Sequence, residues 1–386
     1  MFTYKLICFD EKAPCHIDRL ALALKQTLID LGLDKTVDVQ LTIDPTEPDA
    51  VIGVYFGSEK VLKSDALTAG VVSALDRYVT LIPVVSDLTR FYEEVPQVLH
   101  QVNGFELSAG GGYVSLASLV LRELGITESR REIFISYRRV DGTVAAEQTH
   151  NYLDKFHFRS FIDQFHLEPG VNVQNDIRAA IERFPLLVVL ETPRAHESEW
   201  VFDEVNYALS HRAGLVIVTW PGNKVTELPL THGLPRLMLR RRDFTNPLLC
   251  RRLKMSALRS IHSHVETEYA RTMVIRRKAL VSSAMASAQE HGWIPLAIPG
   301  WSVIATSKTG RRLLMSSVAS TPQGEDLYSA DEARACQTEI SEAHVIHETQ
   351  KFLPGHLAYL NWIMSGRMIE LTTLTSLDAL WRRRRP

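Results

Sequence analysis

A short polar cluster follows the apolar stretch Ile133–Tyr137, and its residue types suit the binding of an anion. Ser136, Arg138, Arg139 and Asp141 make up this cluster. A guanidinium offers forked donors that match the oxygens of a pyrophosphate. If the apolar stretch is a strand of an open α/β sheet, the cluster lies at its carboxyl end, where such sheets bind ligands. The alternative is that one of the two arginines is only solvated surface.

A second candidate group is the pair Trp200 and Glu204, which stands after another apolar stretch, Leu186–Leu190. The two residues are one helical turn apart, so they are expected to project from the same face near the start of a helix. A carboxylate in a binding site can stabilise developing positive charge, and an indole can contact a nucleotide. The structural alternatives are a surface glutamate favoured by the helix dipole and a partly buried tryptophan.

The ordered motifs of Arg131–Gly222 resemble a bacterial TIR (Toll/interleukin-1 receptor) domain. The stretches that carry the resemblance are Arg-Glu-Ile-Phe-Ile-Ser-Tyr-Arg-Arg-Val-Asp-Gly at Arg131–Gly142, Phe-Ile-Asp at Phe161–Asp163, Leu-Glu-Pro-Gly at Leu167–Gly170 and Ser-Glu-Trp-Val-Phe-Asp-Glu at Ser198–Glu204. They cover less than a third of the chain. A TIR domain that keeps the glutamate is commonly an NAD-cleaving enzyme.

The resemblance implies an NAD+ nucleosidase in which Glu204 is the catalytic residue. Nicotinamide leaves as a neutral pyridine, so the enzyme has to stabilise an oxocarbenium-like ribose, much as glycosidases do. The product would be ADP-ribose or a cyclic form of it. NAD+ is then a substrate, and neither a cofactor nor a metal is expected. The expected substrate-binding residues are Ser136, Arg138, Arg139, Asp163, Phe165 and Trp200.

The segment Asp163–Gly170 resembles the BB loop of the family, which borders the nucleotide site and mediates contacts between TIR domains. Phe165 and His166 are candidates for stacking on a base or on a neighbouring chain, and local packing is equally plausible for each. The resemblance also implies an effector of antiphage defence that becomes active by self-association. The flanking parts of the chain would then sense a trigger or support assembly, and the activator is a small molecule, a protein or a nucleic acid.

Two other functions compete with the enzyme. A non-enzymatic TIR scaffold would only recruit partners, and it is expected to lack the glutamate that this chain keeps at Glu204. A nucleic-acid-triggered sensor would use basic runs, of which the chain has Arg240–Arg242, Arg276–Lys278 and the tail Arg382–Arg385. Such runs are most often solvated surface, and the formal net charge of −2 gives no whole-chain case for nucleic-acid or membrane binding.

Alternating strands and helices are expected to position the site. Residues 1–128 predict strands at Tyr4–Phe9, Asp49–Phe56 and Val79–Val85, and helices at Ile17–Leu31, Asp65–Asp76 and Tyr113–Leu124. The next unit predicts strands at Ile133–Tyr137, Ser160–Ile162, Leu186–Leu190, Gly214–Thr219 and Leu237–Arg240, and helices at Thr143–Phe156, Gln174–Arg183 and Glu199–His211. This alternation is typical of parallel, flavodoxin-like sheets with helices on both faces.

The two units also look like an internal repeat. One constant offset places Glu204–Leu209 over Gly70–Leu75 and Leu186–Leu190 over Ile52–Phe56, although apolar strands also match by chance. Ser198 then falls on Ser64. In this register the first unit has Ala66 in place of Trp200 and Gly70 in place of Glu204, so it is interpreted as a degenerate TIR-like unit without the active-site pair.

The last part of the chain predicts a smaller α+β domain. Thr245–Gln289 is helix-rich and is expected to pack against the TIR-like sheet. Beyond it, the sequence predicts a hairpin of Trp301–Ala305 and Arg312–Val318, a helix at Ala330–Lys351, strands at Leu357–Trp362 and Met368–Leu371, and a final helix at Ser376–Trp381. This order weakly resembles restriction-endonuclease-like domains. Leu313–Val318 lacks the acid and lysine that hold their metal, so a binding or assembly role is expected instead of nuclease chemistry.

Length and composition are consistent with several globular domains. The 386 residues are 45% apolar, and the predicted division is 1–128, 129–246, 247–290 and 291–386. The four cysteines have no CxxC spacing, no signal peptide is expected before Tyr4–Phe9, and no apolar run reaches the length of a membrane helix. A cytoplasmic protein without membrane contact is therefore expected. The pairs His262 with His264 and His344 with His347 are interpreted as surface histidines.

Overall fold

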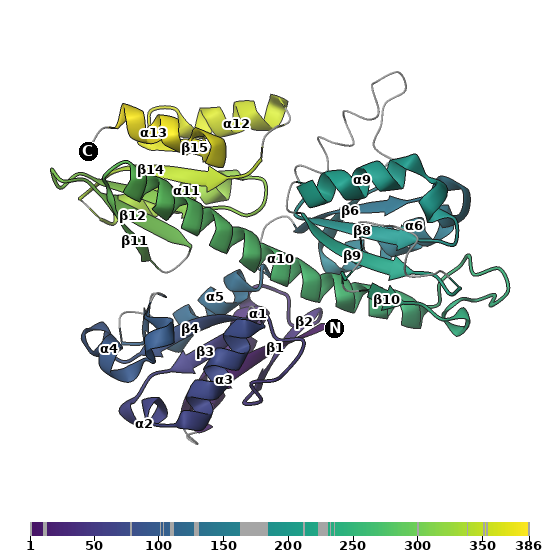
Figure 1. The fold of residues 1–386 in the computed structure, drawn as a ribbon, viewed down its shortest axis with the longest axis horizontal. Coiled ribbons are helices and arrows are strands. Elements are labelled where there is room, and N and C mark those ends of the chain that lie inside the picture. The colour runs from purple at the N-terminus through teal and green to yellow at the C-terminus, as the bar shows by residue number, and fades with distance from the viewer. Residues whose placement is uncertain are drawn as a thin grey trace.

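The computed structural model describes residues 2–10, 14–77, 79–100, 102, 104–108, 112–126, 131–162, 184–210, 213–222, 231, 233–234, 236–298, 301–337, 339–349, 352 and 354–384. Three five-stranded sheets are arranged around one long helix, α10 (Met255–Glu290), as Figure 1 shows. The fold is α/β, with two parallel sheets of the flavodoxin-like kind and a mixed sheet in the C-terminal part, as the sequence predicts.

The first sheet is wholly parallel and has the strand order β2-β1-β3-β4-β5. Its strands are β1 (Phe2–Phe9), β2 (Val37–Thr42), β3 (Ile52–Phe56), β4 (Thr80–Val85) and β5 (Phe105–Glu106). The α-helices are α1 (Pro14–Asp30), α2 (Glu59–Leu62), α3 (Asp65–Asp76), α4 (Phe91–Glu94) and α5 (Gly112–Glu123). Helices α1 and α5 share one hydrophobic core with α10, and α3 closes the opposite face. All of the predicted elements are present, and the strands β2 and β5 and the short helices α2 and α4 are additional.

The second sheet is also parallel, with the order β10-β9-β8-β6-β7. Its strands are β6 (Arg131–Tyr137), β7 (Phe158–Phe161), β8 (Leu186–Glu191), β9 (Gly214–Thr219) and β10 (Arg236–Met238), and its described helices are α6 (Arg139–Leu153) and α9 (Glu199–Ser210). Helices α6 and α10 cover one face, and α9 covers the other. The predicted helix Gln174–Arg183 lies outside the described residues.

The two parallel sheets have the same topology. In each, the first strand lies between the second and the third, and the fourth and fifth follow in order. At the offset found in the sequence, α3 falls on α9 and β4 falls on β9, residue for residue. Ser64 and Ser198 occupy the same place before these helices, where each hydroxyl accepts a backbone hydrogen bond three residues on, at 3.4 and 3.5 Å. The shared geometry supports an internal repeat.

Helix α10 is a component of all three cores. Its 36 residues contain neither glycine nor proline, and the chain leaves the helix after Glu290 through Gly292, where φ is +78°. Ile261, Val265, Tyr269 and Met273 pack into the core of the second sheet. The helix also contributes to the core of the first sheet and to that of the C-terminal sheet; these residues are Ala270, Val274, Leu280, Ala284 and Ala288.

A buried ionic cluster joins α10 to the first strands of both parallel sheets. Arg131 of β6 forms a bidentate pair with Glu266 of α10, and the Tyr4 hydroxyl of β1 donates to the same carboxylate. The guanidinium carbon of Arg131 also lies 3.9 Å from the ring centroid of Phe158. Burial by itself would raise the pKa of Glu266, but Arg131 and a hydrogen bond with His262 outweigh it and hold that pKa at about 2. Such a pair is fully charged at neutral pH.

The C-terminal sheet is mixed, with the order β11-β12-β13-β14-β15. Strands β11 (Ile294–Ile298), β12 (Ser302–Thr306) and β13 (Arg312–Ser317) are antiparallel, and β13, β14 (Ile340–His347) and β15 (Ile369–Thr373) are parallel. The helices are α11 (Gly324–Ala335), α12 (Pro354–Met364) and α13 (Leu377–Arg383). The predicted hairpin corresponds to β12 and β13, and β11 was not predicted.

Two predicted elements of this part are wrong. The helix predicted at Ala330–Lys351 is in fact the end of α11 followed by β14. A capping box of Gln323 and Asp326 starts α11 earlier than predicted. Polar glutamates and histidines in β14 gave that strand a helical composition. The strand predicted at Leu357–Trp362 lies in α12, which Pro354 opens at a position where a missing N–H costs nothing.

Candidate functional site

The polar residues of the candidate site lie between the second sheet and helix α9. The apolar contacts of this layer come from Val201 and Val205 of α9 and from Phe134, Val189 and Ile217 of the sheet. Successive residues of a strand point to opposite faces, so the residue two positions beyond each sheet residue also faces α9. These positions define the face on which polar side chains collect.

Three polar residues follow from that alternation at the carboxyl ends of the strands. Ser136 of β6, Glu191 of β8 and Thr219 of β9 are 1%, 1% and 0% exposed. Among the described residues, the Ser136 Oγ has no hydrogen-bond partner. A buried hydroxyl without a partner costs free energy, so this position is suited to a ligand group. The predicted place of Ser136, at the end of a buried strand, agrees with the structure.

Glu204 lies on the buried face of α9. It is 6% exposed and shares this face with Val201, Val205 and Ala208. The reading of Glu204 as an ordinary surface glutamate is therefore wrong. Trp200, one turn earlier, is 47% exposed. About half of its surface is therefore packed against the protein, and the other half is open to a ligand. The helix thus carries an open indole at its start and an enclosed carboxylate one turn further on.

The equivalent layer of the first sheet is filled with apolar groups. Phe9 pairs with Tyr55, and Ser136 pairs with Val189, in the registers of the two sheets. Tyr55 and Val189 are equivalent in the repeat, so Phe9 is the counterpart of Ser136. Gly70, the counterpart of Glu204, packs so tightly that an added Cβ would lie 3.3 Å from the Phe9 ring and 3.2 Å from Pro45. Gly57 and Val85 stand at the places of Glu191 and Thr219. Because a Cβ added at Gly70 would meet the Phe9 ring, the counterpart positions Glu204 and Ser136 are expected to face the same layer between sheet and helix.

Arg138 joins the end of β6 to the segment before α9. Its guanidinium donates to Glu197 at 3.1 Å and lies 3.5 Å from Asp141. Glu197 in turn accepts from Arg194 at 2.7 Å. The hydrogen bond from Arg194 is the main cause that lowers the pKa of Glu197, and the charge of Arg138 adds to it. A pyrophosphate at this point would have to compete with these carboxylates for Arg138.

The sequence did not single out the network formed by Glu191, Thr219 and Arg236. The Glu191 carboxylate accepts from Thr219 at 2.7 Å and from Arg236 of β10 at 2.6 Å. Arg236 also donates to Thr231. The sequence did contain one signal for this network: Glu191 is the last residue of an otherwise apolar strand. A buried charge needs a buried partner, so a cation could have been expected nearby. The network joins the carboxyl ends of β8 and β9 to the first residue of β10, beside the candidate site.

Other predicted site residues are placed differently or not at all. Arg139 opens α6 and is exposed, so it does not share the buried layer with Ser136 and Glu204. Asp163 and Phe165 lie outside the described residues. Within the described part of the chain, no group of three or more histidine, cysteine, aspartate or glutamate side chains is placed to hold a metal ion.

The histidine pairs were expected on the surface, and that expectation is wrong for three of their four members. His262, His344 and His347 are 4%, 0% and 1% exposed. His262 hydrogen-bonds Glu266 and stacks on Phe156, so it belongs to the ionic cluster around α10. His347 has its pKa lowered to about 4 by burial. These side chains fill cores.

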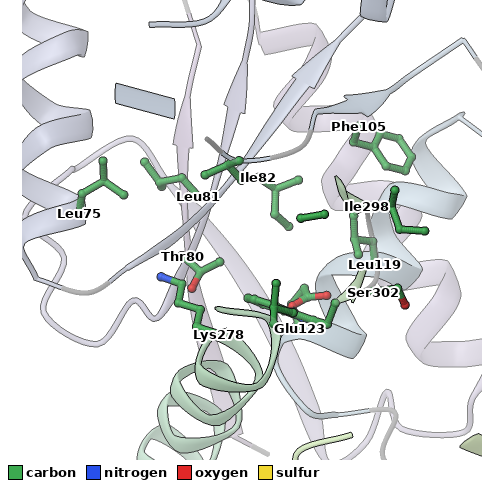
Figure 2. A pocket seen from close by; sticks show the side chains of 14 residues that line it. Leu75, Thr80, Leu81, Ile82, Phe105, Leu119, Glu123, Lys278, Ile298 and Ser302 are labelled. Atoms are coloured by element: carbon green, nitrogen blue, oxygen red, sulfur yellow. The ribbon is translucent and has the colours of Figure 1, made fainter. Parts of the chain in front are cut away.

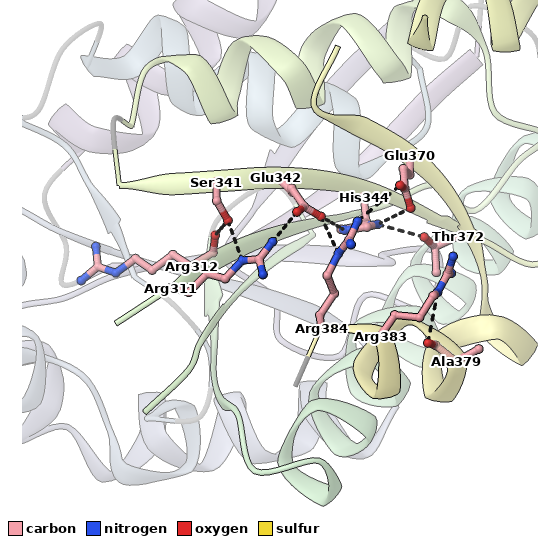
Figure 3. Close-up of polar contacts among 10 residues, drawn as sticks. All are labelled: Arg311, Arg312, Ser341, Glu342, His344, Glu370, Thr372, Ala379, Arg383 and Arg384. Carbon is pink, nitrogen blue, oxygen red and sulfur yellow. Dashed lines mark hydrogen bonds and ion pairs between the residues drawn. The ribbon is translucent and has the colours of Figure 1, made fainter. Parts of the chain in front are cut away.

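Several of the arginines that suggested a basic surface are paired with carboxylates. Arg384 of the tail donates to Glu342 at 2.9 Å, and Arg311 binds the same carboxylate (Figure 3). Arg276 is 6% exposed at its side chain and lies 3.1 Å from Glu348. A hydrogen bond with His344 and the charges of the two arginines lower the pKa of Glu342 to about 2. Their charge is therefore largely neutralised within the C-terminal domain.

Comparison with known proteins addresses the second sheet. No curated protein matches the chain. In the part that the structure describes, no helix is both long enough and apolar enough to cross a membrane. A family model described as TIR domain matches residues 133–249, which include β6 and α9 with Ser136, Trp200 and Glu204. This chain therefore contains a TIR domain, formed by residues 133–249.

Proposed function

We propose that the TIR domain is an NAD+ glycohydrolase in which Glu204 stabilises the reacting ribose. The observation that carries the proposal is the enclosed Glu204 carboxylate on the helix face that packs on the sheet, together with a Ser136 hydroxyl that has no partner among the described residues. The repeat unit supplies the contrast, because Phe9 and Gly70 close the same layer there. The second unit keeps a carboxylate at the position where the first has a glycine, so the two units differ at the residue to which the family resemblance assigns catalysis.

The chemistry requires little more than charge placement. The nicotinamide–ribose bond breaks with its electron pair moving to the ring nitrogen, and the ribose gains oxocarbenium character. The Glu204 carboxylate stabilises that positive charge and orients the ribose hydroxyls. Water, or another group of the same substrate, then attacks the anomeric carbon. Hydrolysis gives ADP-ribose and cyclisation gives a cyclic form.

The remaining site residues bind the rest of the dinucleotide in this proposal. The Ser136 hydroxyl hydrogen-bonds a ribose oxygen, and Arg138 exchanges Glu197 or Asp141 for the pyrophosphate. Trp200, with its indole 47% exposed, contacts the nucleotide. Arg139, Asp163 and Phe165 remain candidates from the family resemblance.

The test is NAD+ turnover by concentrated full-length protein, followed by liquid chromatography of nicotinamide and ADP-ribose. Glu204→Gln keeps the shape and removes the charge, and we expect it to lower turnover by about 10²-fold or more. The control is Glu199→Gln, which removes an exposed carboxylate from the first turn of the same helix. We expect the control to retain wild-type turnover. Equal turnover by wild type and Glu204→Gln would refute the role of Glu204.

Regulation by self-association is part of the proposal. Unchecked cleavage of NAD+ kills a cell, and TIR domains commonly self-associate, so activity that depends on assembly fits an antiphage effector. Turnover per molecule should then rise with protein concentration, while a non-associating enzyme gives a constant value. Absence of turnover at every concentration, together with intact assembly, would favour the scaffold function in place of catalysis.

A further inference from the structure

A cavity of about 220 Å³ lies where the first sheet, α10 and the C-terminal hairpin meet (Figure 2). It exists because β5 pairs only with Val84 and Val85, so within the described chain the Thr80–Ile82 half of β4 has no strand on that side. Helices α5 and α10 and the strands β11 and β12 enclose the space instead. Most of its wall is apolar; examples are Leu81, Ile82, Phe105, Leu119, Val281 and Ile298.

Two hydrogen-bond donors in this wall have no partner among the described residues. Thr80 is 7% exposed, and its Oγ1 has no hydrogen-bond partner among the described residues. Lys278 projects from α10 toward Thr80 in Figure 2, and no hydrogen bond or ion pair joins it to the described part of the chain. Its residue is exposed at the rim, yet partial burial lowers the pKa of its ammonium group. A cation and a buried hydroxyl thus face one end of an apolar space.

The other polar groups of the wall already have partners. Glu123 accepts a hydrogen bond from the Trp301 indole and lies 3.8 Å from Arg122. The Ser302 hydroxyl is 3.0 Å from that of Ser316. Burial outweighs the charges of Arg277 and Arg122 and raises the pKa of Glu123 to about 7. Glu123 therefore carries less negative charge at neutral pH than an ordinary glutamate, which reduces its repulsion of an anion in the cavity.

These features select one class of ligand. A cation would be repelled by Lys278, and a neutral hydrocarbon would leave both donors unpaired. A nucleotide would lack partners for its base and sugar in so apolar a wall. We propose that this cavity binds a small apolar monocarboxylate, with its carboxylate between Lys278 and Thr80 and its apolar body against Ile82, Phe105 and Leu119. Such a ligand bridges the first sheet, α10 and the C-terminal domain, and its binding does not depend on activity of the TIR domain.

The test is isothermal titration calorimetry of the full-length protein with decanoate, and with decanol as the uncharged analogue. We expect saturable binding of decanoate at one site per chain. Decanol should bind at least about tenfold more weakly, because a charge-assisted hydrogen bond is lost. Lys278→Met keeps the length of the side chain and should weaken decanoate about tenfold or more, and Thr80→Val should weaken it several-fold. Lys308→Met, at an exposed lysine of the C-terminal hairpin turn, is the control and should bind like the wild type.

Three results would overturn the proposal. They are the absence of saturable binding of decanoate, equal affinity of decanoate and decanol for the wild type, and equal affinity of decanoate for wild type and Lys278→Met. The comparison of the two ligands uses only the wild type, so it decides the question even if a variant fails to fold. Thermal unfolding of each variant without ligand separates loss of the site from loss of the fold.

Discussion

At the scale of single residues, burial distinguishes two glutamates that look equivalent in the sequence. Glu199 and Glu204 lie on the same helix, and only Glu204 faces the sheet. The order of residues along the chain made Ser136, Trp200 and Glu204 candidates for the site. It could not identify Arg236, because the partner that makes it relevant, Glu191, is far away in sequence and meets it only when β8, β9 and β10 align.

Glu123 makes stability depend on pH. Its pKa is about 7 in the folded chain, above the ordinary value of 4.5, so the folded state binds this proton more tightly. The resulting stability is fully present below pH 4.5 and is lost as the pH rises through about 7. The loss is at most roughly 3 kcal/mol, the free-energy equivalent of the shift.

The measurement is urea unfolding of wild type and Glu123→Gln at pH 5 and pH 8. Glutamine still accepts the Trp301 hydrogen bond and does not titrate. We expect the difference in unfolding free energy between the two pH values to be smaller for the variant. The same pH dependence in both proteins would show that Glu123 titrates normally.

At the scale of elements, topology was predictable where the hydrophobic period was clear. The apolar runs at Leu186–Leu190 and Gly214–Thr219 gave the buried strands β8 and β9. The errors fall in the C-terminal domain, where β14 contains a half-buried glutamate and two histidines that are buried within the sheet. Pairing between distant strands cannot be predicted from the local composition of one segment.

The Arg131–Glu266 pair should matter more than a surface pair. Arg131→Met leaves the Glu266 carboxylate buried without its cation, and we expect a loss of about 3–5 kcal/mol in unfolding free energy. Arg312→Met, which breaks a pair with Glu339 whose two side chains are 42% and 66% exposed, should cost at most about 1 kcal/mol. Urea unfolding of both variants tests this. The double variant Arg131→Met with Glu266→Leu should recover part of the loss, and equal costs for the two single variants would contradict the assignment.

At the scale of the whole molecule, α10 couples the three sheets. Met273 packs into the core of the second sheet, and its neighbour Val274 packs into the core of the first. Both side chains stand on one helix. Loss of packing against the first sheet should therefore shift the helix and disturb its packing against the second sheet.

Val274→Asp tests this coupling. A buried unpaired charge should lower the unfolding free energy by about 3 kcal/mol or more. Hydrogen exchange should then show reduced amide protection in β6 and β8 as well as in β1 and β3. The control Ile275→Asp alters a residue that is 50% exposed on the same helix and should leave protection unchanged. Loss of protection confined to the first sheet would mean that the sheets open independently.

The position of α10 also limits how this TIR domain can be exchanged between proteins. Ile261, Val265 and Tyr269 complete its core from a segment that follows residues 133–249 in the chain. A recombination event that transferred only those residues would give the recipient a sheet with one face covered by α6 alone. Transfer together with α10 would bring apolar residues shaped for two other cores. Descendants of this arrangement should therefore inherit the three parts together, and they should diverge by substitution within the chain more readily than by domain shuffling.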